Sequence, residues 1–263
     1  MEIGLTVGES IDRIEATAAG FDFVEFGLAE ASDIPESIDD DRLRETLDRL
    51  DLALDVHLPF KQVVATPVPE INEALVTHKR RLLKWAGSLG ARKAVLHGTV
   101  RDPYDTDQRE VVADQLGRIV DVGREYGVEV VVENVGHQRY GLQLSVLGDI
   151  AEKIDAPMCF DLGHAYMEED NDGLERFAKY HGDQVSHLHV HDVRGRGDTH
   201  IPIGAGEIDY DIVAEQFDGF DGTVAVEVFT DDRSLLRDTA RRAATHLGGT
   251  FDPTGASAGS RYP

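Results

Sequence analysis

Residues 105–134, DTDQREVVADQLGRIVDVGREYGVEVVVEN, contain one complete helix–strand unit. The first part, 105–126, has apolar residues at helical spacing, and Gly127 is a residue type that commonly ends helices. A β-branched run follows over 128–134 and ends in Glu133 and Asn134. A short buried strand joined to a longer amphipathic helix is the repeating unit of a parallel sheet.

The same unit recurs along the whole chain. Strands are predicted at 3–7, 23–27, 52–58, 94–98, 128–134, 158–163, 185–191 and 223–229, and helices at 10–19, 39–50, 70–89, 105–126, 144–154, 174–181, 210–217 and 232–246. Eight such units in about 250 residues match a (β/α)8 barrel, whereas a doubly wound sheet has fewer strands and a glycine-rich first turn. We therefore predict an α/β fold, a single (β/α)8 TIM barrel over residues 1–247, followed by a flexible tail over 248–263.

The composition limits where the protein is expected to occur and which residue types could bind a metal. Asp and Glu number 50 against 26 Lys and Arg, which gives a net charge of −24, and only six of the cations are lysine. This balance resembles that of halophilic proteins from salt-accumulating organisms. No apolar run is long enough for a membrane helix, and Glu2 follows Met1 directly, so we expect a cytoplasmic protein with no membrane partner. Cys159 is the only cysteine, so a metal site would need His, Asp and Glu ligands.

Polar side chains follow six consecutive predicted strands, at the end of the barrel where active sites of this fold lie. The carboxylates of Glu133, Asp161 and Glu227 would repel one another there unless they were protonated or bound a cation. Nitrogen and oxygen donors without a thiolate suit zinc, manganese, cobalt or iron. The polar residues of these strand ends and of the loop after the seventh strand are Asp55, His57, His97, Glu133, Asn134, Asp161, His164, His187, His189, His191, Asp192, Asp198, His200 and Glu227. We predict that carboxylates and neutral imidazoles among them hold a divalent metal.

Because side chains alternate between the two faces of a strand, residues two positions apart share a face and lie at different depths in the barrel. His187, His189 and His191 share one face, and we expect His187 to be a hydrogen-bonded core residue and His191 to lie nearest to solvent. By the same period Asp55 lies beneath His57 and is predicted to accept a hydrogen bond from its ring. Cys159 is expected to be a small buried residue.

Three residues of the rim are candidates for substrate contact. Arg194 and Arg196 form its most basic spot and are suited to clamp a phosphate or carboxylate, with a solvated loop as the alternative. His137 lies above the fifth strand, where it faces either substrate or water.

From the third strand to the eighth, the chain resembles the xylose-isomerase-like TIM barrels, which include sugar isomerases and epimerases and AP endonucleases of the endonuclease IV type. The resemblance rests on the motifs HLP at 57–59, LHG at 96–98, VEN at 132–134, DLGHA at 161–165, LHVHD at 188–192, DTH at 198–200, GAGEI at 204–208 and VE at 226–227. The isomerase branch implies one divalent ion, zinc, manganese, cobalt or magnesium, on Glu133, Asp161, His189 and Glu227. The endonuclease branch implies three zinc ions, held by the same four residues together with His57, His97, His164, Asp198 and His200.

The two branches imply different reactions. In the isomerase branch, Glu133 and Glu227 would exchange a proton on the carbon beside a metal-bound carbonyl. In the endonuclease branch, three ions would bind a phosphodiester and activate a water. The segment 4–10 and Phe60 depart from the endonuclease pattern, and the mouth offers few cations for phosphates, so tight DNA binding is not expected.

Isomerisation or epimerisation of a small sugar or sugar phosphate is therefore the first hypothesis. Substrate contacts are predicted from Arg194, Arg196, His191 and His137. Trinuclear-zinc phosphodiester hydrolysis is the alternative, and a non-catalytic metal-binding barrel is the third. The fold is also compatible with a homo-oligomer.

Overall fold

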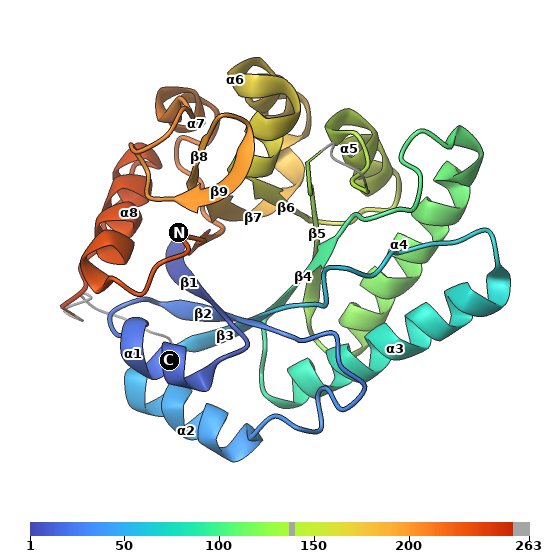
Figure 1. The fold of residues 1–263 in the computed structure, drawn as a ribbon, viewed down its shortest axis with the longest axis horizontal. Helices are drawn as coiled ribbons and strands as arrows, with labels where there is room; N and C mark the ends of the chain where they lie inside the picture. Colours follow the sequence, from blue (N-terminus) through green and yellow to red (C-terminus); the bar gives the residue numbers. More distant parts are fainter. Residues whose placement is uncertain (137–139, 255–263) are drawn as a thin grey trace.

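Eight parallel strands close into a barrel in the computed structural model, which describes residues 1–136 and 140–254. Around the barrel the strands follow the order β1, β10, β7, β6, β5, β4, β3, β2, so each neighbour in sequence is also a neighbour in space (Figure 1). The predicted (β/α)8 barrel is thus confirmed. The barrel strands are β1 (Glu2–Gly8), β2 (Phe23–Gly27), β3 (Ala53–His57), β4 (Lys93–His97), β5 (Glu129–Glu133), β6 (Met158–Asp161), β7 (Val185–Val190) and β10 (Thr223–Val226).

Helices surround the barrel and cover its outer face (Figure 1). Ser10 and Asp39 accept hydrogen bonds from the first turns of α1 and α2, as N-cap residues do. The apolar faces of the helices pack on the outward side chains of the strands, and this layer forms the main hydrophobic core. The helices are α1 (Ile11–Thr17), α2 (Asp40–Leu50), α3 (Pro69–Ser88), η1 (Thr106–Gln108), α4 (Arg109–Glu125), α5 (Leu144–Lys153), α6 (Leu162–His181), η2 (Gly182–Gln184), α7 (Tyr210–Gln216) and α8 (Arg233–His246).

The inside of the barrel is largely polar. Val95, Val131 and Cys159 form a small apolar cluster of their own, separate from the main core. Around it, Glu25, Glu133, His187 and His189 are each 1% exposed or less. Buried polar groups require partners, so this interior is held together by hydrogen bonds and charge as well as by packing.

Helix α6 differs from the prediction. The expected helix at 174–181 is only its second half, because α6 already begins at Leu162, directly after β6. The carboxylate of Asp161 accepts a hydrogen bond from the backbone N–H of His164 at 2.5 Å and caps the helix there. The two halves meet at a kink where Asp170 has a φ of 57°.

The predicted loop that carries Asp198 and His200 is a β-hairpin. It consists of β8 (Asp192–Arg194) and β9 (Gly197–Ile201), paired antiparallel. Gly195 and Arg196 form its two-residue turn with φ values of 65° and 54°. Two positive φ angles are what a tight turn of the hairpin type requires, and the glycine adopts its conformation without strain.

The first residues after α8 fold back on the end of that helix and on the segment before β2. The backbone N–H of Gly249 donates to the carbonyl of Ala244 at 2.8 Å, and the Phe251 ring centroid lies 5.1 Å from that of Phe21. Residues 255–263 of the predicted flexible tail lie outside the described residues. In the two described stretches, no helix is both long enough and apolar enough to cross a membrane.

Lys79 ties α3 to the segment that follows β3. Its side chain is buried, and its Nζ donates to the carbonyl of Pro59 at 3.3 Å. Burial lowers the pKa of Lys79 to about 8, although the negative charge of Glu30 acts in the opposite direction.

The pKa of Lys79 predicts a pH-dependent stability. Between pH 8 and pH 10.5 the unfolded chain retains a proton that the folded chain has released, so folding becomes more favourable as the pH rises. The free energy of unfolding of the wild type, relative to Lys79→Met, should increase by about 2 kcal/mol between pH 7 and pH 9.5. Urea unfolding of both proteins at the two pH values measures this difference, and parallel pH profiles would contradict it.

Candidate metal centre

Four donor side chains converge at the C-terminal end of the barrel. Nδ1 of His189, on β7, lies 3.1 Å from Oε2 of Glu227, 3.4 Å from Oε1 of Glu133 and 3.7 Å from Oδ2 of Asp161. Glu133 ends β5, Asp161 ends β6, and Glu227 directly follows β10. These four residues, here called the central group, are the set predicted to hold one divalent ion.

The central group contains polar atoms that lack hydrogen-bond partners. Nδ1 of His189 and Oε2 of Glu227 are both buried, and neither makes a hydrogen bond within the described part of the chain. Buried polar atoms without partners are costly and rare. A divalent cation that bound both atoms would remove this cost, and the imidazole and carboxylate donors suit zinc, manganese or cobalt. The residues therefore fit a metal ion.

A first flanking group lies beside β3 and β4 and consists of His57, His97 and Glu133. Oε2 of Glu133 lies 3.2 Å from Nε2 of His57 and 3.0 Å from Nε2 of His97. Donor atoms of the three residues lie within 4.8 Å of one another. Because Oε1 of Glu133 faces His189, this carboxylate joins the first flanking group to the central group.

A second flanking group, His164, Asp198 and His200, joins α6 to the hairpin. Oδ1 of Asp198 lies 2.7 Å from Nε2 of His200 and 3.7 Å from Nε2 of His164. His200 has a φ of 42°, and its ring stacks on that of Phe229 with centroids 3.9 Å apart. Strained backbone of this kind is concentrated at functional sites in proteins.

The electrostatics of the three groups favour ionised carboxylates beside protonated rings at His57, His164, His189 and His200, whereas burial lowers the pKa of His97. Burial raises the pKa of Glu133, but the charges of His97 and His189 outweigh it and hold the pKa well below its ordinary value. Burial lowers the pKa of His200, yet the hydrogen bond to Asp198 and the charge of Glu227 raise it to about 9. Positive charge is thus required here, and a metal ion would supply it in exchange for these protons.

The structure brings all nine predicted ligands together in the central and flanking groups, but two details of the prediction are wrong. His191 does not lie toward solvent: it is fully buried, with Nε2 3.2 Å from Oδ2 of Asp161. The backbone of Gly163 leaves room for its ring, since a Cβ there would lie 2.0 Å from it. Asp55 does not contact His57. It accepts hydrogen bonds from Arg92 and the Lys93 backbone, while Nδ1 of His57 lies 2.9 Å from the carbonyl of Leu58.

The two rim arginines contact the protein itself. Arg194 donates to the carbonyl of Ala205, and Arg196 pairs with Asp170 at the kink of α6. Both contacts hold the hairpin, and a substrate contact by either arginine stays a prediction. The predicted substrate contact of His137 falls outside the described residues.

Two buried residues of the site have roles that the sequence did not indicate. Asn134 donates to the carbonyl of Asp161 at 2.9 Å and accepts from its N–H at 2.8 Å, which fixes the backbone of a central ligand. Glu25 on β2 accepts from the rings of His187 and His189 at 3.1 and 3.0 Å. The available signal for Glu25 was a lone carboxylate in the apolar strand FVEFG at 23–27.

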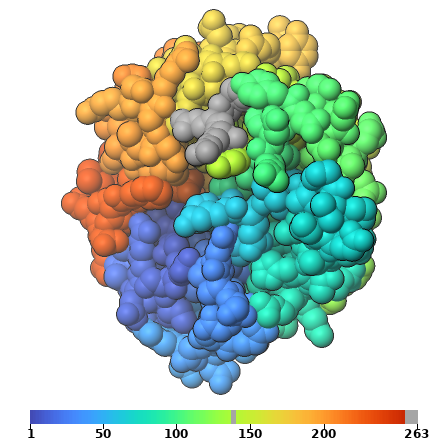
Figure 2. Space-filling model, turned by 45° about the vertical axis from the view of Figure 1, so that its right-hand side comes forward, coloured from blue at the N-terminus to red at the C-terminus, as the bar shows by residue number. Residues whose placement is uncertain are grey.

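A cavity of about 200 Å³ opens beside the central and first flanking groups. The exposed rings of Phe60 and Phe229 lie at this cavity. Figure 2 shows segments from distant parts of the chain meeting on one face of the molecule, where the orange of the hairpin lies close to the cyan segment after β3. A larger cavity of about 710 Å³ lies among the starts of β5, β6 and β7, at the opposite end of the barrel. The smaller cavity is lined by Thr6, Gly8, Glu9, Arg13, Glu25, Gly27, Leu28, His57, Phe60, Glu227 and Phe229.

Known proteins share this architecture. The uncharacterized protein MJ1311 of Methanocaldococcus jannaschii is 27% identical over 197 residues, which cover 70% of this chain and 67% of that protein. A D-tagatose 3-epimerase-like protein superposes with a TM-score of 0.75 at 23% identity, over 94% of this chain and 97% of the other, which shows a shared fold. The TTHB071 protein of Thermus thermophilus, from a crystal soaked with ZnCl2, superposes with a TM-score of 0.69 at 26% identity, over 91% and 96% of the two chains.

The family assignment rests on most of the chain. Residues 14–248 match the model of one family, and this range runs from α1 through the end of α8. The chain belongs to the xylose isomerase-like TIM barrel family.

Proposed function

We propose that the protein is a divalent-metal-dependent isomerase or epimerase that moves a proton on the carbon beside a carbonyl group of a small sugar. The observation that carries this proposal is the central group, in which two carboxylates, Glu133 and Glu227, reach the same ring nitrogen of His189 from well-separated strands. The fold shared with a D-tagatose 3-epimerase-like protein supports it.

The carboxylates of this chain are suited to the proton transfer. A divalent ion, when bound, polarises the substrate carbonyl and makes the neighbouring C–H more acidic. Glu227 lines the cavity with its side chain 17% exposed, so we assign it the removal of the proton. Glu133 lies deeper, at 1% exposure, on the other side of the central group. Because its carboxylate is ionised at rest, it first takes up a proton from the ring of His57, whose Nε2 lies 3.2 Å from Oε2 of Glu133, and then returns that proton to the substrate carbon.

The cavity suits an uncharged compound of monosaccharide size. Its volume of about 200 Å³ is below the range of roughly 300–1,000 Å³ typical of sites for drug-sized ligands. Among the described residues that line it, Arg13 is the one lysine or arginine, and its guanidinium pairs with Asp231 and donates to the carbonyls of Val228 and Thr230. Three carboxylates line the same cavity, those of Glu9, Glu25 and Glu227, which favours a free sugar over a sugar phosphate.

Removal of either carboxylate should abolish the reaction. Glu133→Gln and Glu227→Gln each keep the side-chain volume but lose the proton acceptor, so turnover should fall by at least about 100-fold. NMR in D2O measures deuterium incorporation at the carbon beside the carbonyl, with D-tagatose and L-ribulose as the first members of a panel of ketoses and their phosphates. Near-normal exchange in either variant would contradict the assigned roles.

Glu129→Gln is the matched control. Glu129 lies at the other end of the same strand as Glu133 and contacts Lys93 and Ser186. This substitution should preserve the exchange rate, and circular dichroism of all three variants should match that of the wild type.

A second candidate is a trinuclear-zinc phosphodiesterase, and the two flanking groups favour it. They add five ligands to the central group, and donor atoms within each flanking group lie close enough for one ion. Glu133 is shared between the central and first flanking groups, as a bridging ligand between two ions would be.

Metal content separates the two candidates. Elemental analysis of protein purified without chelator should give close to one ion per chain for the isomerase and close to three zinc ions for the phosphodiesterase. In the second case Asp198→Asn should remove one zinc, and the wild type should nick a duplex that carries an abasic analogue in high salt. Bound metal without turnover in either assay would instead favour the non-catalytic barrel.

A further inference from the structure

A chain of hydrogen bonds runs through the barrel interior below the central group. Oγ1 of Thr223 on β10 lies 2.6 Å from Nδ1 of His187, and Nε2 of His187 lies 3.1 Å from Oε2 of Glu25. The same oxygen of Glu25 lies 3.0 Å from Nε2 of His189. Each of the four residues is at most 6% exposed.

The geometry determines where the ring protons lie. An ionised carboxylate only accepts hydrogen bonds, so each imidazole nitrogen that faces Oε2 of Glu25 must carry a proton. In a neutral His187 ring, Nδ1 is then an acceptor, and the hydroxyl of Thr223 donates to it. In His189 the proton at Nε2 leaves Nδ1 as the nitrogen available to a metal.

We propose that Glu25 is a positioning residue for the metal centre. It holds the Nε2 proton of His189 and so directs the Nδ1 lone pair toward Glu133, Asp161 and Glu227. Thr223 and His187 keep Glu25 in place. This inference rests on the proposed function only in requiring an ion at the central group.

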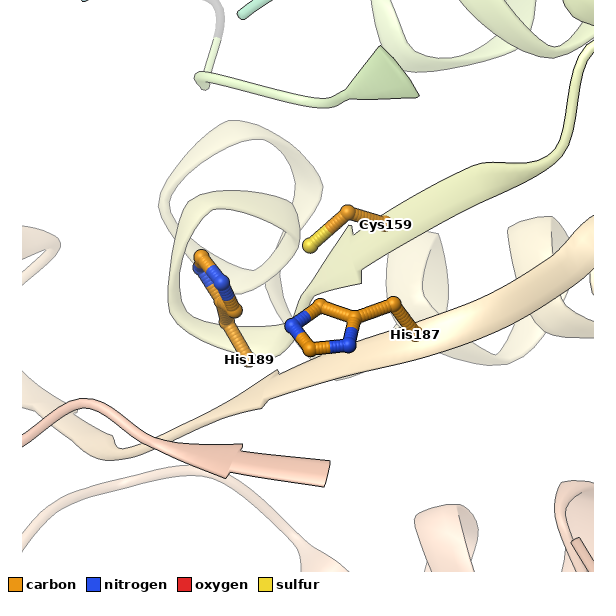
Figure 3. A group of neighbouring side chains, drawn as sticks. All are labelled: Cys159, His187 and His189. Atoms are coloured by element: carbon orange, nitrogen blue, oxygen red, sulfur yellow. The ribbon is translucent and has the colours of Figure 1, made fainter. Parts of the chain in front are cut away.

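The neighbouring sulfur does not form a second metal site. Figure 3 shows Cys159 on β6 beside the rings of His187 and His189 on β7, and donor atoms of the three lie within 4.8 Å of one another. Both Nε2 atoms are engaged by Glu25, however, and Nδ1 of His187 is engaged by Thr223. Burial also raises the pKa of the Cys159 thiol well above its ordinary value, which keeps it a poor ligand. Cys159 and His187 therefore lie beneath the central group and form no metal site of their own.

Zinc affinity tests the proposal without an activity assay. Metal-free wild type and variants are titrated with zinc against a chromophoric chelator, and cobalt absorption spectra report the ligand geometry. Glu25→Gln should weaken zinc binding by about 10- to 100-fold and alter the cobalt spectrum, because losing the carboxylate behind a histidine ligand has effects of this size. Thr223→Val should act in the same direction, and Thr223→Ser, which retains the hydroxyl, should restore the wild-type affinity.

Asp55→Asn is the matched control. Asp55 is another fully buried carboxylate of the barrel, but it contacts Arg92 and the Lys93 backbone and no ligand of the central group. Its replacement should leave zinc affinity within about twofold of the wild type.

The outcomes separate this inference from the proposed function. Folded Glu25→Gln with unchanged zinc affinity and cobalt spectrum would overturn the role of Glu25, and if that variant does not fold, unchanged binding by Thr223→Val would overturn it. If the wild type binds no zinc or cobalt, both the inference and the metal-dependent function fail. Wild-type binding that Glu227→Gln weakens but Glu25→Gln does not would overturn the inference alone.

Discussion

The site depends on compensating the charge of carboxylates buried inside a closed barrel. Glu25, Glu133 and Asp161 are 1% exposed or less, and isolated carboxylates at such depth would be protonated or would unfold the chain. Imidazoles contact each of them, and these contacts hold the pKa of Glu133 and Asp161 below their ordinary values. The barrel interior is therefore organised as alternating acid and imidazole, and a cation at its C-terminal end would complete that pattern.

This requirement also shapes the elements around the barrel. Asp161 ends β6, caps α6 and contacts His191, so one carboxylate sets both the start of a helix and the position of a buried ring. The hairpin of β8 and β9 carries Asp198 and His200 back over the barrel, and the Arg196 contact with Asp170 attaches it to the kink of α6. Irregular backbone is tolerated here because the surrounding contacts determine it.

The sequence predicts the barrel and the convergence of polar side chains at one of its ends because both follow from local patterns, while the set of nine ligands is what the resemblance implies. Parallel strands end at one face, so polar residues at strand ends converge without any knowledge of the loops. Contacts between side chains from distant parts of the chain leave no comparable pattern in the sequence. Glu25 contacts His189, which lies 164 positions further along the chain. Asp55 contacts Arg92 rather than His57, because the tilt of the strands decides which layer of the barrel interior each side chain occupies. The hairpin has no strand pattern in the sequence because its two short strands lie within a polar segment.

Exposure varies within each group of donors. In the central group His189 and Asp161 are fully buried while Glu227 is 17% exposed, and in the second flanking group His200 is 4% exposed while Asp198 is 48% exposed. An ion in the central group would be held from below by buried ligands, with Glu25 behind its histidine, and would face the cavity through Glu227. An ion in the second flanking group would meet solvent through Asp198. The buried layers beneath would be the same whether one ion served the proposed proton transfer, with the flanking donors facing substrate, or three zinc ions served the alternative hydrolysis.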